Sequence, residues 1–284
     1  MPSPRLLYAL AAVIAAVALA AMVPRLGAAQ AGGARSSTVR KVYPSAVRVE
    51  MAAAGEVVRS AAGIAFARED GRTYVLTNAH VVEPSRTWRQ PVALRILVSG
   101  ERQPRQGKVV ARGRVPDTDL AVVEISGADV PVTPLARDDS LALGEDLIVI
   151  GAPFGKGLSV AAGIVSQVKY ERGESAAAPR VPRALKTDAA IGYGSSGGGV
   201  FDVPGGRLVG LVEGYRTARV AFGKDEGYSF DVPMPGETFA VPAARIRRFL
   251  VERGLGRLAP GTATAATRVR PGAAQGAVSP ASGM

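Results

Sequence analysis

The chain has 284 residues, 47% of them hydrophobic and 21% charged, which is enough to bury a sizeable core in one large or two small domains. It contains no cysteine and a single histidine, so disulfides, thiol catalysis, cysteine-based zinc sites and any site with two or more imidazoles are excluded. The formal net charge is +11, but the basic residues are spread along the whole chain, so the charge alone identifies no anionic partner.

Residues 1–31 have the pattern of an export segment. An uncharged run from Leu6 to Val23 ends at Pro24, and Ala29-Gln30-Ala31 follows as a small-x-small cleavage pattern. The run is intermediate in length between the apolar core of a signal peptide and a membrane-spanning helix. Two alternatives stay open, a cleaved signal peptide and a membrane anchor retained through residues 6–23. Both predict an extracytoplasmic protein, periplasmic or secreted.

A folded region is predicted from residue 42 to residue 254, after a small-residue, basic linker at 32–41. Its apolar stretches are short, rich in Val and Ile, and separated by Gly, Pro, Asp and Arg turns. They run over residues 46–51, 62–67, 74–77, 92–98, 108–111, 120–125, 147–150, 159–168, 207–212 and 227–231. This pattern is typical of an all-β barrel or sandwich.

One helix is predicted near the end of the folded region, over Pro242–Arg253. Proline suits the first helical turn, three apolar residues share one face, and Gly254 stops the helix. The residues that follow, 255–284, are rich in Ala, Gly, Pro, Thr and Ser, so we expect a disordered tail.

His80, the only histidine, follows the strand-like segment Tyr74-Val75-Leu76-Thr77. This position, where a buried strand meets a loop, is a usual one for a catalytic base. Asp119 lies at the entry to another apolar strand, where a carboxylate tends to be buried and needs a partner. A ring N–H of His80 would be a suitable partner. Taken singly, each residue would more often have a structural role than a catalytic one.

Ser196 lies in a glycine-rich segment, Gly194-Ser195-Ser196-Gly197-Gly198. Glycine reaches backbone angles closed to other residues, so this serine can occupy a tight, exposed turn. The backbone N–H groups of Gly194 and Ser196 can then converge as an oxyanion hole. The alternative, a flexible linker, fits poorly between two strand-like segments. The order His, Asp, Ser is one of the known orders for a serine-hydrolase triad, and it differs from the Ser, Asp, His order of α/β-hydrolases.

Three motifs carry a family resemblance. Residues 76–82 (LTNAHVV), 118–123 (TDLAVV) and 187–198 (TDAAIGYGSSGG) resemble the histidine, aspartate and serine motifs of trypsin-like serine proteases of the HtrA/Deg type. Residues 150–155 (IGAPFG) and 239–242 (FAVP) match non-catalytic stretches of the same family. The resemblance implies two perpendicular six-stranded antiparallel β-barrels, with the triad His80, Asp119 and Ser196 in the cleft between them.

The resemblance also implies the substrate-binding residues. The pocket beside Ser196 is expected to be lined by Ala190, Ile191 and the strand residues Val212, Glu213 and Gly214. No aspartate lies where a pocket for Lys or Arg would hold one, so a small or medium apolar side chain is expected there. An extended, unfolded polypeptide would pair with the same strand.

The serine motif departs from the family pattern. Ser195 stands where the family usually has Asn, Gly192-Tyr193 replaces Asn-Pro, and Gly199 stands where Pro is common. These changes lie beside the predicted oxyanion hole. We also expect no peptide-binding PDZ domain after residue 254, because only the low-complexity tail follows.

The sequence therefore predicts an exported serine endopeptidase that cleaves unfolded or misfolded proteins, in the manner of a quality-control protease. Neither a cofactor nor a metal is expected, nucleic-acid binding has no supporting motif, and the resemblance is compatible with a homotrimer. The alternative from another class is a catalytically weak or inactive barrel that binds proteins as a chaperone-like module.

Overall fold

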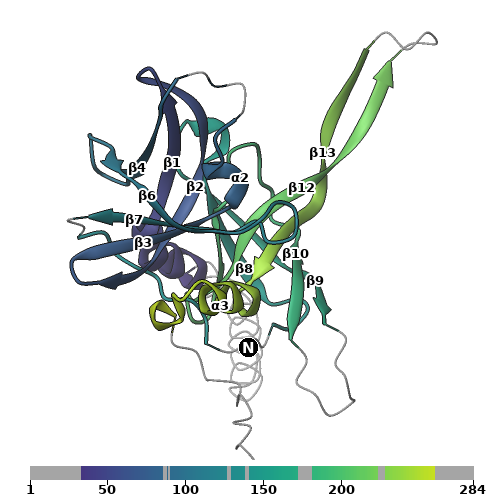
Figure 1. Cartoon of the computed structure of the whole chain (residues 1–284). Coiled ribbons are helices and arrows are strands. Elements are labelled where there is room, and N and C mark those ends of the chain that lie inside the picture. The colour runs from purple at the N-terminus through teal and green to yellow at the C-terminus, as the bar shows by residue number, and fades with distance from the viewer. Residues whose placement is uncertain are drawn as a thin grey trace, which may run out of the picture.

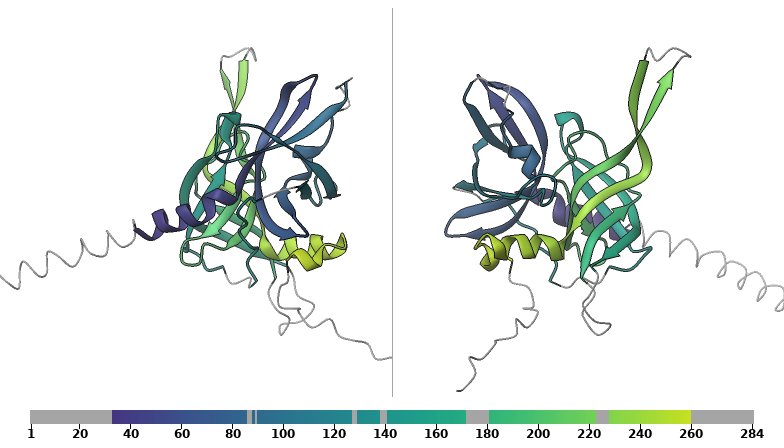
Figure 2. Two further views of the ribbon diagram at one scale, coloured as in Figure 1. Left: turned by 90° about the vertical axis from the view of Figure 1, so that its left-hand side faces the viewer. Right: turned by 45° about the vertical axis from the view of Figure 1, so that its right-hand side comes forward.

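The computed structural model describes residues 33–85, 88, 90–126, 129–137, 141–171, 181–222 and 228–259. The export segment predicted at 1–31 and the part of the tail from residue 260 onward lie outside these residues. Two β-structures stand side by side, with helix α3 (Ala243–Glu252) beneath them in the view of Figure 1; Figure 2 shows the same pair from two other sides. No helix in the described part of the chain is both long and apolar enough to cross a membrane.

The first β-structure is a seven-stranded antiparallel sheet in the order β5-β4-β1-β2-β3-β7-β6. Its strands are β1 (Ala46–Ala53), β2 (Glu56–Glu69), β3 (Arg72–Thr77), β4 (Val92–Val98), β5 (Arg105–Gln106), β6 (Lys108–Arg112) and β7 (Ala121–Ser126). Alternate residues such as Val47 and Val49 face one apolar cluster, as the period of two along a strand requires. Tight turns at Ala54-Gly55 and Asp70-Gly71 join the first three strands, with positive φ at both residues of each turn.

The second β-structure is a closed six-stranded barrel in the order β10-β13-β12-β11-β8-β9. Its strands are β8 (Asp146–Gly151), β9 (Ser159–Tyr170), β10 (Pro182–Thr187), β11 (Gly199–Asp202), β12 (Leu208–Phe222) and β13 (Tyr228–Pro242). Phe201, Leu185 and Leu211 are among the side chains that fill it. The predicted all-β, trypsin-like fold is confirmed. The first β-structure differs from the predicted six-stranded barrel: it is a sheet of seven strands, one of them only two residues long.

Strand β13 is much longer than the segment 227–231 predicted from the sequence. Proline and glycine within the run (Pro233, Pro235, Gly236) are unfavourable in a regular strand, because proline cannot donate to a ladder. The register shows how they are tolerated: Tyr215 pairs with Thr238 while Thr217 pairs with Pro233, so the intervening residues of β13 bulge out of the ladder. Beyond the bulge β12 and β13 continue as a two-stranded arm that projects from the barrel (Figure 1).

Helix α3 covers nearly the predicted range and packs by the expected face. Ile246, Phe249 and Leu250 are buried, and Gly254 with a φ of +70° ends the helix. Pro242 is the N-cap rather than the first helical residue.

Residues 33–42 form a helix in place of the linker expected at 32–41. Tertiary contacts account for the difference, because Val42 is fully buried in the core and the Thr38 hydroxyl donates to the Val203 carbonyl at 2.7 Å. Composition favoured a linker, but docking onto the barrel outweighs it.

Residues 255–259, the first of the predicted tail, likewise pack onto the folded region. Leu258 is buried in the short helix η3 (Gly256–Leu258), and Arg257 forms an ion pair with Glu69 of β2 at 2.9 Å.

Candidate active site

His80 lies in a single helical turn, α2 (Ala79–Val82), directly after β3. Arg59 of β2 fixes this turn from one side: its Nη1 donates to the carbonyls of His80 and Glu83, both at 2.6 Å, and to that of Val81 at 3.3 Å. These carbonyls would otherwise lack partners at the end of a helical turn. The turn that carries the imidazole is therefore held by a side chain from the neighbouring strand.

Asp119 lies two residues before the start of β7 and holds His80 by two contacts. Its Oδ2 lies 2.6 Å from His80 Nδ1, and its Oδ1 accepts the backbone N–H of His80 at 2.9 Å. The Asp119 side chain is 8% exposed, whereas the neighbouring Asp117 is exposed. Asn78 donates to the Asp119 carbonyl at 2.8 Å. A carboxylate at Nδ1 favours the tautomer whose Nε2 is free to accept a proton.

Ser196 lies in the loop between β10 and β11, clamped between two strands. Its carbonyl accepts the Ala62 N–H of β2 at 2.9 Å, and the next residue, Gly197, donates to Val212 of β12 at 2.9 Å. Gly197 has a φ of +79°, and a Cβ there would lie 2.2 Å from the Ala62 carbonyl oxygen. Only glycine fits this close approach.

Among the described residues, the Ser196 hydroxyl donates to the backbone carbonyl of Glu213, at 3.4 Å, and not to His80. This is a long bond and therefore a weak one. Catalytic hydrogen bonds are often long in the absence of substrate, so the arrangement leaves Ser196 free to turn to His80.

The two N–H groups predicted to form an oxyanion hole are both available. Within the described part of the chain, neither Gly194 N nor Ser196 N donates to a protein acceptor. The loop between them is nevertheless well tied, because Ser195 N donates to Gly192 at 3.1 Å and Gly198 N donates to Ser195 at 2.9 Å. Gly194 has a φ of +89°.

Two positions of the serine motif that depart from the family pattern, Ser195 and Gly199, are tightly packed. Ser195 is buried and lies against Gly151 of β8. A Cβ added at Gly151 would lie 2.8 Å from Ser195 Cβ. At Gly199 an added Cβ would lie 2.5 Å from the Phe201 ring and 2.8 Å from Ile64, so a larger residue would need the core to move.

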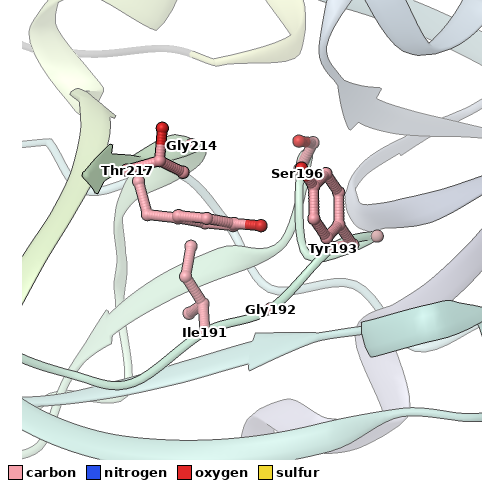
Figure 3. Close-up of a pocket in the computed structure, with 8 residues that line it drawn as sticks. Ile191, Gly192, Tyr193, Ser196, Gly214 and Thr217 are labelled. Atoms are coloured by element: carbon pink, nitrogen blue, oxygen red, sulfur yellow. The ribbon is translucent and has the colours of Figure 1, made fainter. Parts of the chain in front are cut away.

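A pocket of about 220 Å³ opens beside Ser196 (Figure 3). Its lining residues are Ile191, Gly192, Tyr193, Gly194, Ser196, Gly214, Tyr215 and Thr217. Of the residues expected to bind substrate, Ile191 and Gly214 line it. The other three do not line it: the Val212 side chain is fully buried, and Ala190 and Glu213 are exposed to solvent.

Sequence reasoning missed the two tyrosines and Thr217 as pocket residues. The Tyr193 and Tyr215 rings meet edge to face with centroids 5.7 Å apart, and burial raises the pKa of Tyr215. The Tyr215 hydroxyl is buried without a hydrogen-bond partner among the described residues. Tyr215 and Thr217 are two residues apart on β12, and that spacing, which places both on one strand face, was the available signal.

Glu213 adds a second carboxylate near the His80–Asp119 pair. Desolvation by the surrounding protein raises its pKa and the negative charge of Asp119 raises it further, whereas Arg245 and His80 lower it. Within the described residues, no three His, Asp or Glu side chains gather in a group that could hold a metal ion.

Comparison with known proteins places this geometry in context. A family model described as "Trypsin-like peptidase domain" matches residues 61–211. The chain is 34% identical over 161 residues to a probable periplasmic serine endoprotease, DegP-like, of Ectopseudomonas mendocina, a match that covers 57% of this chain and 30% of the relative. It is 32% identical over 223 residues to the human serine protease HTRA4, a match that covers 76% of this chain and 41% of the relative.

Solved structures agree on the fold. The serine endoprotease from Yersinia pestis matches with a TM-score of 0.56 and 24% identity, over 78% of this chain and 66% of that one. The HtrA-type protease AlgW with a tripeptide matches with a TM-score of 0.56 and 25% identity, over 78% and 64% of the two chains. The chain spans less than half the length of the curated relatives it matches.

Proposed function

Because the chain belongs to the trypsin-like peptidases of the HtrA type, we propose that it is a serine endopeptidase that uses His80, Asp119 and Ser196. The observation that carries the proposal is the 2.6 Å contact between His80 Nδ1 and Asp119 Oδ2, on a turn that follows a buried strand. This contact orients the only imidazole of the chain so that Nε2 is the proton acceptor.

The reaction proceeds in two halves. Ser196 Oγ attacks the carbonyl carbon of the scissile peptide bond while His80 takes its proton, and His80 then gives that proton to the leaving amine. A water molecule, deprotonated by His80, hydrolyses the acyl-enzyme and restores Ser196. Asp119 stays ionised throughout and stabilises the imidazolium.

Negative charge develops on the carbonyl oxygen of the substrate in both halves. The N–H groups of Gly194 and Ser196 have no described protein acceptor, and this supports a role for them as donors to that oxygen. Deletion of one such donor typically costs about 10²–10³ in kcat, so the hole is a large part of the catalysis.

The substrate is proposed to be an extended segment of unfolded polypeptide. Its backbone would lie along the strand segment 212–214 of β12, and the side chain before the cleaved bond would enter the pocket beside Ser196. Ile191 and the two tyrosine rings favour a small or medium apolar side chain there, and none of the described residues that line the pocket is acidic.

A role in extracytoplasmic protein quality control fits these features. The curated relatives include proteins named as periplasmic, and the chain begins with an export-like segment at 1–31. A homotrimer and retention at the membrane through residues 6–23 remain proposals of the same kind.

Two observations favour a second candidate, a protein-binding module with weak or no catalysis. Among the described residues, Ser196 Oγ donates to the Glu213 backbone carbonyl rather than to His80, and Ser195, Gly192 and Tyr193 depart from the family pattern next to it. In that case the barrel would hold unfolded chains without cleaving them.

The two candidates separate by labelling with a fluorophosphonate probe and measuring intact mass. Purified protein and the Ser196→Ala variant would each be treated with and without an unfolded protein such as casein. We expect one adduct on the wild type and none on the variant. An adduct that forms only with casein would mean that the nucleophile becomes active on substrate binding.

A wild type that is folded and takes no adduct under either condition would contradict the protease assignment and favour the binding module. A His80→Ala variant gives a second check. Loss of labelling in the folded variant would support His80 as the base, and labelling at the wild-type rate would count against it.

A further inference from the structure

Phe154 holds an unusual backbone conformation beside the serine loop. It lies in the short turn η2 (Pro153–Gly155) with φ of 55° and ψ of 15°, in the left-handed region. The other described non-glycine residues with positive φ, Ala54 and Asp70, lie in two-residue hairpin turns that require it. A bulky residue in this region is strained, and no hairpin accounts for Phe154.

Packing of the aromatic ring does not account for the strain either. The Phe154 residue is 70% exposed, one of the most exposed large apolar residues in the described part of the chain. Strain that persists without burial indicates that the backbone orientation itself matters.

The backbone N–H of Phe154 has a specific partner. It donates to the carbonyl of Tyr193 at 2.6 Å. The Tyr193–Gly194 peptide is planar and trans, so its N–H points away from its C=O. The bond that draws the Tyr193 carbonyl toward η2 therefore turns the Gly194 N–H away from η2, and Gly194 lines the pocket beside Ser196.

Glycine at 194 allows this contact to be close. A Cβ at Gly194 would lie 2.5 Å from the Ala152 carbonyl oxygen and 3.2 Å from Phe154 N. The turn and the serine loop therefore pack backbone against backbone.

The first sheet holds the η2 turn in place. Arg48 of β1 donates from Nη1 to the Gly155 carbonyl at 2.9 Å, and the buried Glu50 holds the Arg48 side chain at 2.8 Å. Gly155 also lies against Ser60 of β2. The position of the Tyr193 carbonyl is thus set from the other β-structure.

We propose that Phe154 is a positioning residue for the oxyanion hole: its left-handed backbone aims its N–H at the Tyr193 carbonyl and so holds the Gly194 N–H toward the reacting carbonyl oxygen. The inference rests on the proposed peptidase function and adds a residue that contacts no reacting atom.

Two substitutions test the backbone against the ring. Phe154→Val places a β-branched residue where positive φ is least tolerated, and we expect kcat to fall about 10- to 100-fold, part of the effect of losing one oxyanion donor, while KM changes less than about 2-fold. Phe154→Gly adopts positive φ without strain, so it should rescue kcat to the wild-type value although the ring is gone. The inhibition constant of a peptide boronate, which mimics the tetrahedral intermediate, should follow kcat.

Ala54→Val is the matched control, because Ala54 has nearly the same φ of 51° but lies in the exposed β1–β2 turn. It should lower the melting temperature as Phe154→Val does, with kcat unchanged. Normal kcat in Phe154→Val would overturn the inference, and so would a Phe154→Gly variant as slow as Phe154→Val, because the ring would then matter instead of the backbone.

A crystal structure of Phe154→Val separates this inference from the peptidase assignment. A rotated Tyr193–Gly194 peptide supports the positioning role whether or not the wild type turns over substrate, and an unrotated one overturns it. Absence of fluorophosphonate labelling in the wild type bears on the assignment alone.

Discussion

The two halves of the site are built in different ways. The corner that carries His80 and Asp119 is fixed by side chains, with two short contacts from one carboxylate and three bonds from Arg59. The loop that carries Ser196 is fixed mainly by backbone bonds and glycines. Among the described residues, the N–H groups of Gly194 and Ser196 have no protein acceptor, and the Ser196 hydroxyl makes one long bond. The proposed base is therefore held mainly by side chains, whereas the proposed nucleophile and oxyanion hole are shaped mainly by the backbone. Side-chain substitutions should therefore damage the first half, and added Cβ atoms the second.

The largest effect is expected from Asp119→Asn. The variant keeps the shape of the corner but favours the wrong imidazole tautomer, so kcat should fall by about 10⁴. Steady-state kinetics and a melting curve would measure it. Asp117→Asn, at an exposed residue two positions earlier, is the control and should keep its activity. A loss of less than tenfold in Asp119→Asn would mean that His80 is oriented by other groups.

Gly194→Ala should break the backbone-built half. The new Cβ would lie 2.5 Å from the Ala152 carbonyl oxygen, so the loop must shift, and kcat should fall by about 10²–10³ with the loss of one oxyanion donor.

Gly144→Ala matches the strain without the clash, because Gly144 has a φ of +85° and no atom of the described residues lies within 4 Å of the added Cβ. It should lose about 1 kcal/mol of stability and no activity. Equal kinetics for the two alanine variants would argue against Gly194 as a donor.

A smaller effect is expected from Arg59→Met, which keeps the length of the side chain but removes its bonds to the turn that carries His80. Small displacements of a catalytic group are costly, and we expect kcat to fall about tenfold. Arg59→Lys should recover part of the loss. Arg72→Met, at an exposed arginine of β3 paired with Glu124, should leave kcat unchanged. A wild-type rate in Arg59→Met would show that Asp119 suffices to hold the turn.

The smallest effect concerns pH and Glu213. Its pKa is raised above the ordinary 4.5 by desolvation first and by Asp119 second. Between 4.5 and the raised value the folded protein binds more protons than the unfolded chain, so the wild type loses stability as pH rises through this window.

Glu213→Gln removes that loss. Because solvent screens an exposed carboxyl group, its melting temperature should exceed that of the wild type by only about 1 °C at pH 7, with no difference at about pH 4. A variant less stable than the wild type at pH 7 would mean that the charge of Glu213 is favourable in the folded protein.

The sequence predicted the fold and the triad candidates because each depends on local pattern. His80, Asp119 and Ser196 stand at strand ends in segments whose residue types are informative alone. The spacing of Tyr215 and Thr217 places both on one strand face, but whether that face borders the pocket depends on where β12 shifts register against β13. The helix at 33–42 was missed for a similar reason, since its stability comes from contacts with distant residues such as Val203.

The single imidazole of this chain makes the site unusually easy to observe. Every histidine signal in a magnetic resonance spectrum is a signal from His80, and every histidine-selective reagent acts on that one ring. A proton on its Nδ1 would lie in the 2.6 Å contact with Asp119, so one resonance would report on the hydrogen bonding of the proposed base. Substrate, inhibitor or a change in the serine loop can therefore be followed at the base without isotope editing or assignment.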